Sequence, residues 1–142
     1  MIHGMPMNKI LLDTHVWIWL LNGDSTLEKT TINHIDKTLQ QGEVWISAIS
    51  LWELGMLEVK KRITLNMPCL EWIQNSLKLG LQITPLTPQI AIESCNLPEY
   101  SQGDPADRII IATARHHALT IMSRDEHILS YGRKKHVSIV KV

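Results

Sequence analysis

Cysteine is scarce in this chain, and long apolar runs are missing. The two cysteines among 142 residues, Cys69 and Cys95, lie far apart and match no metal-binding spacing. A disulfide scaffold is therefore excluded, and we expect a reducing, cytoplasmic setting with two inert thiols. No apolar run reaches the roughly 20 residues that a membrane-spanning helix needs. Residues 1–7 lack the pattern of a signal peptide, and we interpret them as a loose lead-in with Met1, Met5 or Met7 as the true start.

The net charge is zero, because 14 Lys and Arg residues balance 14 Asp and Glu residues. The overall charge therefore indicates no class of partner, and nucleic-acid binding would need local basic clusters instead. The runs Lys60–Arg62 and Arg133–Lys135 meet that need, but both also fit a solvated helix end or turn. The absence of a glycine-rich phosphate loop argues against P-loop nucleotide hydrolysis. Seven histidines form no zinc pattern, and His116 and His117 suit the end of a helix.

What the chain does contain is an alternation of short apolar runs and helical patterns. Its length and its 44% apolar content fit one domain with a single core. We predict strands at 10–12, 44–46, 82–86, 119–122 and 137–140, and helices at 14–21, 25–41, 50–61, 68–79, 88–95, 105–118 and 126–131. Pro85 places the third strand at an edge of the sheet or in an extended loop. The alternation predicts an α/β fold in which helices cover both faces of a small parallel sheet.

Four acidic residues stand at the junctions of these elements: Asp13, Glu53, Asp107 and Asp125. In a parallel α/β sheet such positions gather at the carboxyl ends of the strands. Two unit charges about 4 Å apart repel by roughly 4 kcal/mol at an effective dielectric near 20. A divalent cation that prefers oxygen ligands, Mg²⁺ or Mn²⁺, would relieve this repulsion. The pattern therefore favours a metal-dependent enzyme.

Each acid also has a purely structural explanation, because Asp and Glu are common at helix starts. Asp13 suits the N-cap of the first helix, and Glu53 completes a capping box. Asp107 follows an expected cap by three residues, and Asp125 is the acid that capping explains least. The expected caps and boxes are Ser25 with Glu28, Ser50 with Glu53, Asp104 with Pro105, and Ser123 with Glu126. We favour function because four separate junctions bring an acid to the same edge.

These acids lie in segments that resemble a known family. The segments are Ile10-Leu11-Leu12-Asp13-Thr14-His15, Ser47-Ala48-Ile49-Ser50-Leu51-Trp52-Glu53-Leu54, Asp104-Pro105-Ala106-Asp107-Arg108-Ile109-Ile110-Ile111-Ala112-Thr113-Ala114 and Ile121-Met122-Ser123-Arg124-Asp125. Together they resemble the PIN-domain ribonucleases, and within them the VapC-type toxins of toxin–antitoxin pairs. The resemblance runs from Asn8 onward and implies one PIN-like domain, a three-layer α/β/α fold around a small parallel sheet.

The resemblance also implies the chemistry of the site. It implies Mg²⁺- or Mn²⁺-dependent cleavage of single-stranded RNA that leaves a 5′-phosphate and a 3′-hydroxyl. Asp13 and Asp107 would hold one or two metal ions, and Glu53 and Asp125 would act directly or through water. The supporting residues would be Thr14, Asp104 and Ser123, where Ser123 replaces the family's usual threonine. Residues placed to hold the RNA backbone are Arg108, Arg124, Lys60 and Lys61.

Partners follow from the same resemblance, which implies an antitoxin protein and a homodimer. Trp52, Met56, Leu57 and Trp72 could line a groove for an amphipathic antitoxin segment, although core packing explains such residues as well. Two alternatives stay open. One is a degenerate nuclease fold that only binds, which would be expected to have lost one of the acids. The other is an aspartyl-phosphate phosphatase, which would need a second acid near Asp13 and a lysine after a late strand.

Overall fold

The computed structural model describes residues 9–100 and 103–142, so the expected lead-in lies outside the described residues. Five parallel strands form one sheet in the order β3-β2-β1-β4-β5. The elements are β1 (Ile10–Leu12), α1 (Thr14–Asn22), α2 (Lys29–Gln40), β2 (Val44–Ser47), α3 (Ala48–Val59), α4 (Cys69–Lys78), β3 (Gln82–Thr84), α5 (Pro88–Cys95), α6 (Pro105–His117), β4 (Thr120–Ser123), α7 (Glu126–Gly132) and β5 (Ile139–Lys141). The predicted α/β class and parallel sheet are confirmed.

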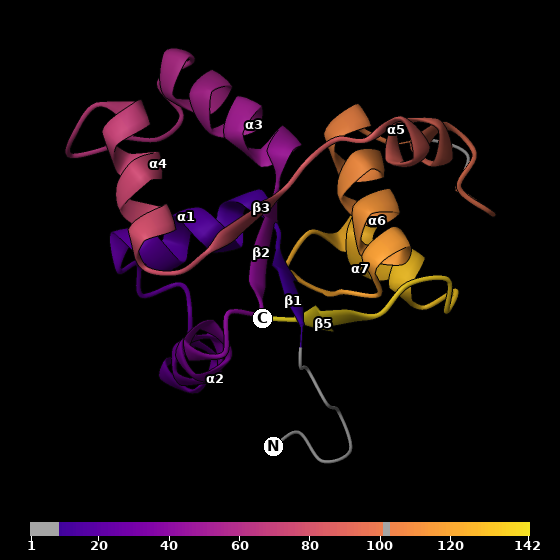
Figure 1. The fold of residues 1–142 in the computed structure, drawn as a ribbon, viewed down its shortest axis with the longest axis horizontal. Helices are drawn as coiled ribbons and strands as arrows, with labels where there is room; N and C mark the ends of the chain where they lie inside the picture. Colours follow the sequence, from indigo (N-terminus) through magenta and orange to yellow (C-terminus); the bar gives the residue numbers. More distant parts are fainter. Residues whose placement is uncertain (1–8, 101–102) are drawn as a thin grey trace.

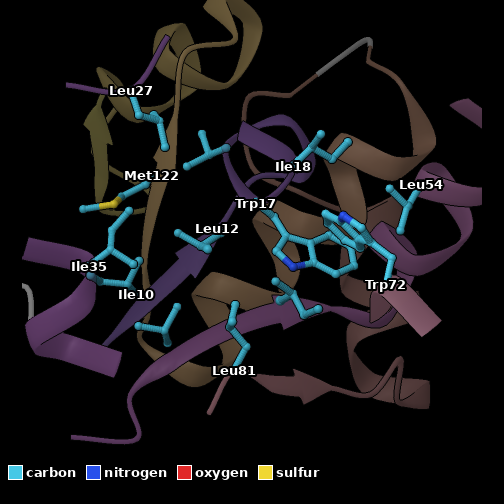
Figure 2. Close-up of a cluster of buried hydrophobic side chains, with 13 residues drawn as sticks. Ile10, Leu12, Trp17, Ile18, Leu27, Ile35, Leu54, Trp72, Leu81 and Met122 are labelled. Carbon is cyan, nitrogen blue, oxygen red and sulfur yellow. The ribbon is translucent and has the colours of Figure 1, made fainter. Parts of the chain in front are cut away.

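Helices cover both faces of the sheet, with α1–α4 on one side and α5–α7 on the other (Figure 1). The side chains of Ile10 and Leu12 point into the first layer and that of Leu11 into the second, and all three are fully buried. This two-sided burial explains why β1 is apolar at every position and does not alternate. In the first layer the rings of Trp17 and Trp72 meet edge to face with centroids 5.0 Å apart (Figure 2).

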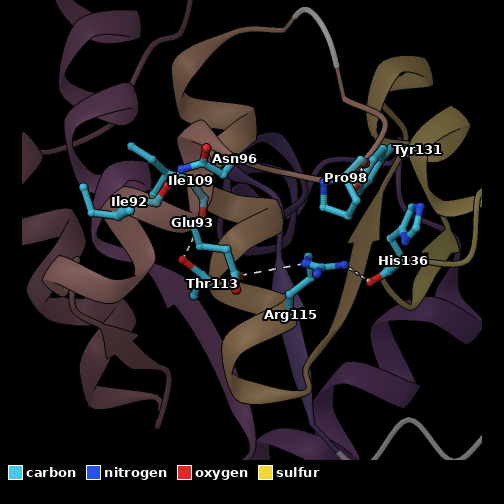
Figure 3. Close-up of polar contacts among 9 residues, drawn as sticks. All are labelled: Ile92, Glu93, Asn96, Pro98, Ile109, Thr113, Arg115, Tyr131 and His136. Atoms are coloured by element: carbon cyan, nitrogen blue, oxygen red, sulfur yellow. Dashed lines mark hydrogen bonds and ion pairs between the residues drawn. The ribbon is translucent and has the colours of Figure 1, made fainter.

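Polar contacts join the elements of the second layer (Figure 3). Arg115 of α6 donates to the His136 carbonyl at 2.7 Å, and its Nε lies 3.8 Å from Glu93 Oε2 of α5. The Tyr131 hydroxyl of α7 donates to the Pro98 carbonyl at 2.7 Å. These contacts join the last turn of α6 to α5 and to the segment before β5, and they join α7 to the segment after α5.

Two predicted helix starts are wrong, and each has a local cause. The Asp24 side chain accepts hydrogen bonds from the Thr26 N–H and hydroxyl, so a turn forms there and α2 begins four residues after Ser25. The capping box of Ser25 and Glu28 is therefore absent. In α3 the cap is Ser47, which accepts from the Ile49 N–H at 3.2 Å, and the helix begins before Ser50.

The other helices and strands differ from the prediction mainly by a few residues at their ends. β3 stops at Thr84, before Pro85, and lies at the edge of the sheet as expected, since proline cannot donate a ladder hydrogen bond. β5 covers Ile139–Lys141 rather than 137–140. Within residues 9–100 and 103–142, no helix is both long and apolar enough to cross a membrane.

Candidate active site

The acidic residues gather at the carboxyl end of the sheet. Asp13 follows β1 directly, and Asp125 follows β4 after one intervening residue. Asp107 lies in the first turn of α6, and Glu53 lies in α3, which begins where β2 ends. Three of the four acids share a cavity of about 220 Å³, and Glu53 is absent from its lining. The cavity is lined by Asp13, His15, Val16, Trp19, Asp107, Arg124 and Asp125.

Asp13 is held from two sides. Its Oδ1 accepts from the Thr14 N–H at 2.8 Å, which makes it the N-cap of α1, and its Oδ2 accepts from the Ser123 hydroxyl at 2.7 Å. The same Ser123 oxygen accepts from the Asp125 N–H at 3.0 Å. One hydroxyl at the end of β4 therefore links the first and last acids of the set. Capping and a role in the cavity coexist in Asp13.

Glu53 is held by the hydroxyl of Thr14 rather than by its own helix end. Thr14 Oγ1 lies 2.5 Å from Glu53 Oε1 and 2.8 Å from Ser50 Oγ. Ser50 is fully buried inside α3, so the predicted capping box of Ser50 and Glu53 is wrong. Because α3 starts before Ser50, the side chains of Ser50 and Glu53 contact Thr14 of α1 and do not cap the N-terminus of α3. The Glu53 carboxylate thus lies beside the residue that follows Asp13.

Asp125 and Asp104 are the N-caps of two helices, Asp104 as predicted and Asp125 in place of Ser123. Asp125 caps α7, where its Oδ1 accepts from the N–H groups of His127 and Ile128 at 2.7 and 3.3 Å. The expected box of Ser123 with Glu126 is therefore wrong, because Ser123 is engaged with Asp13. Asp104 caps α6 by accepting from the Asp107 N–H at 3.4 Å, as predicted, with Pro105 at the first helical position.

The pKa values of three acids in the site are raised. Burial, followed by the charges of Asp125, Asp13, Asp104 and Glu53, raises the pKa of Asp107 from 3.8 to about 8. Burial also raises the pKa of Asp13 above its usual range, against the opposing effect of the Ser123 hydroxyl. Burial raises the pKa of Glu53 as well, and the nearby Asp13 and Asp104 add to that shift. A site with this charge favours the binding of protons or cations.

The donor set suits a hard cation that keeps part of its water shell. Among the residues that the structure describes, no three carboxylate, imidazole or thiol groups lie close enough together to hold one ion. The expectation that several acids share direct coordination is therefore not met in this arrangement. Mg²⁺ usually takes one or two carboxylates together with waters and substrate phosphate. Asp13 and Asp107, which line the same acidic cavity, fit that smaller requirement.

Several residues predicted for RNA or partner binding lie elsewhere. Arg108 donates to the carbonyls of Ser94 and Tyr100, both at 3.1 Å, so its guanidinium joins α6 to α5 instead of facing the cavity. Lys60 and Lys61 are exposed at the far end of α3, away from the cavity lining. The predicted roles of Arg108, Lys60 and Lys61 at the acidic site are therefore not supported by their positions.

The expected antitoxin groove is also changed. Trp72 is buried in the first core layer, and its indole N–H donates to Asn22 Oδ1 at 3.1 Å. Leu57 packs partly buried against the same core, whereas the Trp52 side chain is 61% exposed. Trp72 still lines a surface cavity of about 420 Å³, but Trp52, Met56 and Leu57 are not part of that lining, so the four residues do not form one groove. Trp52 is the member of the set that is open to a partner.

Sequence reasoning missed three residues of the site. His15 and Trp19 line the cavity from α1, and the buried Ser50 contacts Thr14. The signal for the first two was available, because positions 15 and 19 lie on the same face of a helix that begins right after Asp13. The signal for Ser50 was hidden by the wrong helix start, which assigned its hydroxyl to a cap.

Comparison with known proteins places the whole domain in one group. The family model described as PIN domain matches residues 10–134. A relative from Mycobacterium tuberculosis (strain ATCC 25618 / H37Rv), named ribonuclease VapC22, is 33% identical over 136 residues, which cover 94% of this chain and 99% of that protein.

Solved structures show the same fold at lower identity. The DNA-bound VapBC of Salmonella typhimurium matches with a TM-score of 0.69 and 17% identity, covering 94% of this chain and 97% of that one. VapBC2 of Rickettsia felis, bound to a DNA fragment from its promoter, matches with a TM-score of 0.66 and 16% identity, covering 93% and 97%. FitAcB of Neisseria gonorrhoeae matches with a TM-score of 0.62 and 24% identity, covering 92% and 95%.

Proposed function

The chain belongs to the PIN-domain family and is a homologue of the VapC ribonuclease toxins, and on that premise we propose that it is a metal-dependent endoribonuclease of single-stranded RNA. The observation that carries this proposal is the cavity shared by Asp13, Asp107 and Asp125. Burial and four neighbouring acids raise the pKa of Asp107 to about 8, so the negative charges of these acids destabilise one another. Such a site gains most from a divalent cation.

Each acid has a distinct part in the proposed mechanism. Asp13 and Asp107 would hold Mg²⁺ or Mn²⁺, and Glu53 and Asp125 would act directly or through bound water. When bound, the ion would lower the pKa of a water and stabilise the charge on the leaving oxygen of the phosphodiester. Two hydroxyls keep the acids in place, since Ser123 fixes Asp13 and Thr14 fixes Glu53. Asp104 caps the helix that presents Asp107.

The direct test replaces Asp13 by Asn, which keeps the shape of the side chain and removes its charge. We expect loss of cleavage of single-stranded RNA, with the circular dichroism spectrum and melting curve of a folded protein. Asp36→Asn, at an exposed position on α2, serves as the matched control and should cleave normally. Chelation by EDTA should stop cleavage, and Mg²⁺ or Mn²⁺ should restore it. Cleavage that survives either the Asp13 change or EDTA would refute the proposal.

One observation favours a second candidate function, a PIN fold that only binds. No three metal-binding side chains converge among the described residues. Isothermal titration of Mn²⁺ into the metal-free protein separates the two functions. The nuclease should bind Mn²⁺ and lose that binding in the Asp13→Asn variant, whereas a binding module should show no titration that depends on Asp13.

We also propose a cytoplasmic toxin that pairs with an antitoxin protein and forms a homodimer. The support is that the solved structures with this fold include VapBC and toxin–antitoxin complexes. The exposed Trp52 offers an apolar contact for such a partner. Co-expression with a small protein encoded next to the gene, followed by purification through one affinity tag, should yield a complex. Trp52→Ala should weaken that complex, and light scattering of the toxin alone should report a dimer.

A further inference from the structure

Resting on the proposed nuclease function, we propose that Trp19 and Arg124 form a binding site for one nucleobase of the RNA strand, beside the carboxylates. Both residues line the cavity that also contains Asp13, Asp107 and Asp125. The lining of the cavity thus combines carboxylates, which suit a metal ion, with an indole and a guanidinium. The indole and the guanidinium have the chemistry that binds unpaired bases.

Arg124 is held in a fixed plane, which distinguishes it from a mobile surface arginine. Its Nε donates to the Val142 carbonyl at 2.7 Å, and its Nη2 donates to the Thr26 carbonyl at 3.0 Å. Its Cζ lies 5.2 Å from the centroid of the Trp19 ring, within the range of a cation–π contact. Two of the three guanidinium nitrogens are therefore engaged with backbone oxygens. An arginine held in this way can still present the flat face of its guanidinium to a ligand. It has fewer free N–H groups with which to bind a phosphate.

The Trp19 ring packs against the guanidinium of Arg124. The ring is half-buried, packs against the first core layer, and belongs to α1, six residues after Asp13. His15, one turn nearer to the acids, is exposed, and its ring centroid lies 6.0 Å from that of Trp19. An unpaired base that enters the cavity from this side would stack on the guanidinium of Arg124 or on the exposed edge of Trp19. The phosphate attached to it would then lie toward Asp13.

Stacking of a base would give the site a selectivity that phosphate contacts alone would not give. A phosphate contact holds every sequence equally, whereas a base site selects single-stranded RNA and prefers the bases that stack well. Stacking of one base on an aromatic or guanidinium face corresponds to roughly five- to 150-fold in binding. The site would therefore act mainly on KM and on the choice of cleavage position, and it would leave kcat at the acids largely unchanged.

The first experiment compares cleavage patterns. A pool of random single-stranded RNA is digested, and the cleaved ends are sequenced for the unaltered protein, Trp19→Leu, Trp19→Phe, Arg124→Lys and Arg124→Met. We expect a base preference next to the cut that is lost in Trp19→Leu and Arg124→Met, retained in Trp19→Phe, and weakened in Arg124→Lys. Leu79→Ala, at an exposed apolar position far along the chain from the cavity lining, is the control and should keep the preference. A preference unchanged in Trp19→Leu and Arg124→Met would overturn the proposal.

The second experiment measures binding without cleavage, so that it separates this proposal from the nuclease proposal. The Asp13→Asn protein is titrated with a labelled oligonucleotide and with the same oligonucleotide carrying one abasic residue at each position in turn. We expect about tenfold weaker binding at one abasic position, and no such loss when Trp19→Leu is added to Asp13→Asn. Equal binding of all the oligonucleotides would refute the base site. If the base effect is present but no variant, including the unaltered protein, cleaves RNA, the base site stands and the nuclease function fails.

Discussion

Replacing Asp107 by Asn should stabilise the metal-free protein even though it should abolish activity. In the folded protein the pKa of Asp107 is about 8, against 3.8 for the free side chain, because of burial and four acidic neighbours. Folding therefore favours the protonated carboxyl. Its stabilising contribution is fully present below pH 3.8 and is lost as the pH rises toward 8. At pH 7.5 the native protein thus carries almost the full cost of this acid, and Asn removes that cost.

The magnitude can be bounded from the shift. The rise from 3.8 to about 8, at about 1.36 kcal/mol for each pKa unit, gives an upper limit of roughly 5–6 kcal/mol. Asp107 is only half-buried, and solvent screens part of the repulsion, so we expect about 1–3 kcal/mol in the free energy of unfolding. For a domain of this size that corresponds to an increase in Tm of roughly 3–9 °C. The gain should grow between pH 4 and pH 8 and then level off.

The assay is thermal unfolding in EDTA across pH 4 to 9, followed by circular dichroism. Asp36→Asn, on the exposed face of α2, is the control and should show no such pH-dependent gain. Adding Mg²⁺ should reduce the advantage of Asp107→Asn, because an ion that binds the native site stabilises the unaltered protein by mass action. A Tm for Asp107→Asn that is unchanged or lower at pH 7.5, or a gain that does not depend on pH, would refute the electrostatic argument.

Three further substitutions test the supports of the site and the core. Thr14→Val removes the hydroxyl that contacts Glu53 and should reduce cleavage about tenfold, whereas Thr14→Ser should retain most of it; equal rates for the two variants in a cleavage assay would contradict this. Ser123→Ala leaves the buried Asp13 without one of its donors and should lower the free energy of unfolding in urea by about 1–3 kcal/mol at pH 7, while Ser123→Thr should keep it; no loss in the alanine variant would count against the bond. Trp72→Ala should lower the free energy of unfolding by about 3–5 kcal/mol, measured in the same way, because this α4 side chain is buried against Trp17; a cost below 1 kcal/mol would indicate a surface role instead.

The sequence was sufficient for the layers of the fold and for the general position of the acids. β1 could be predicted because every one of its residues is apolar and buried, and Asp13 marks its end. Pro85 gave the edge position of β3. The order of the strands could not be predicted, because it depends on which helix covers which face, and the residues of β1 are apolar on both faces.

The local environment of the acids was harder to foresee, since capping patterns are ambiguous. Ser47 and Ser50 both precede a helical pattern, and only the packing of α3 against α1 decides that Ser47 caps and Ser50 is buried. Ser123 and Asp125 likewise compete for the start of α7. The buried Asp13 decides the outcome by engaging the Ser123 hydroxyl. Long-range contacts of this kind leave no trace in the spacing of residues.

The Ser123 hydroxyl, which joins Asp13 to the backbone of Asp125, also sets the moment at which the acidic cavity can exist during synthesis. The ribosome makes Ser123 110 residues after Asp13, and Asp125 follows Ser123. Nascent domains fold as their segments emerge, so a partly made chain has one carboxylate of this pair without the other. A complete cavity can therefore form only after the segment that carries Ser123 and Asp125 has left the ribosome.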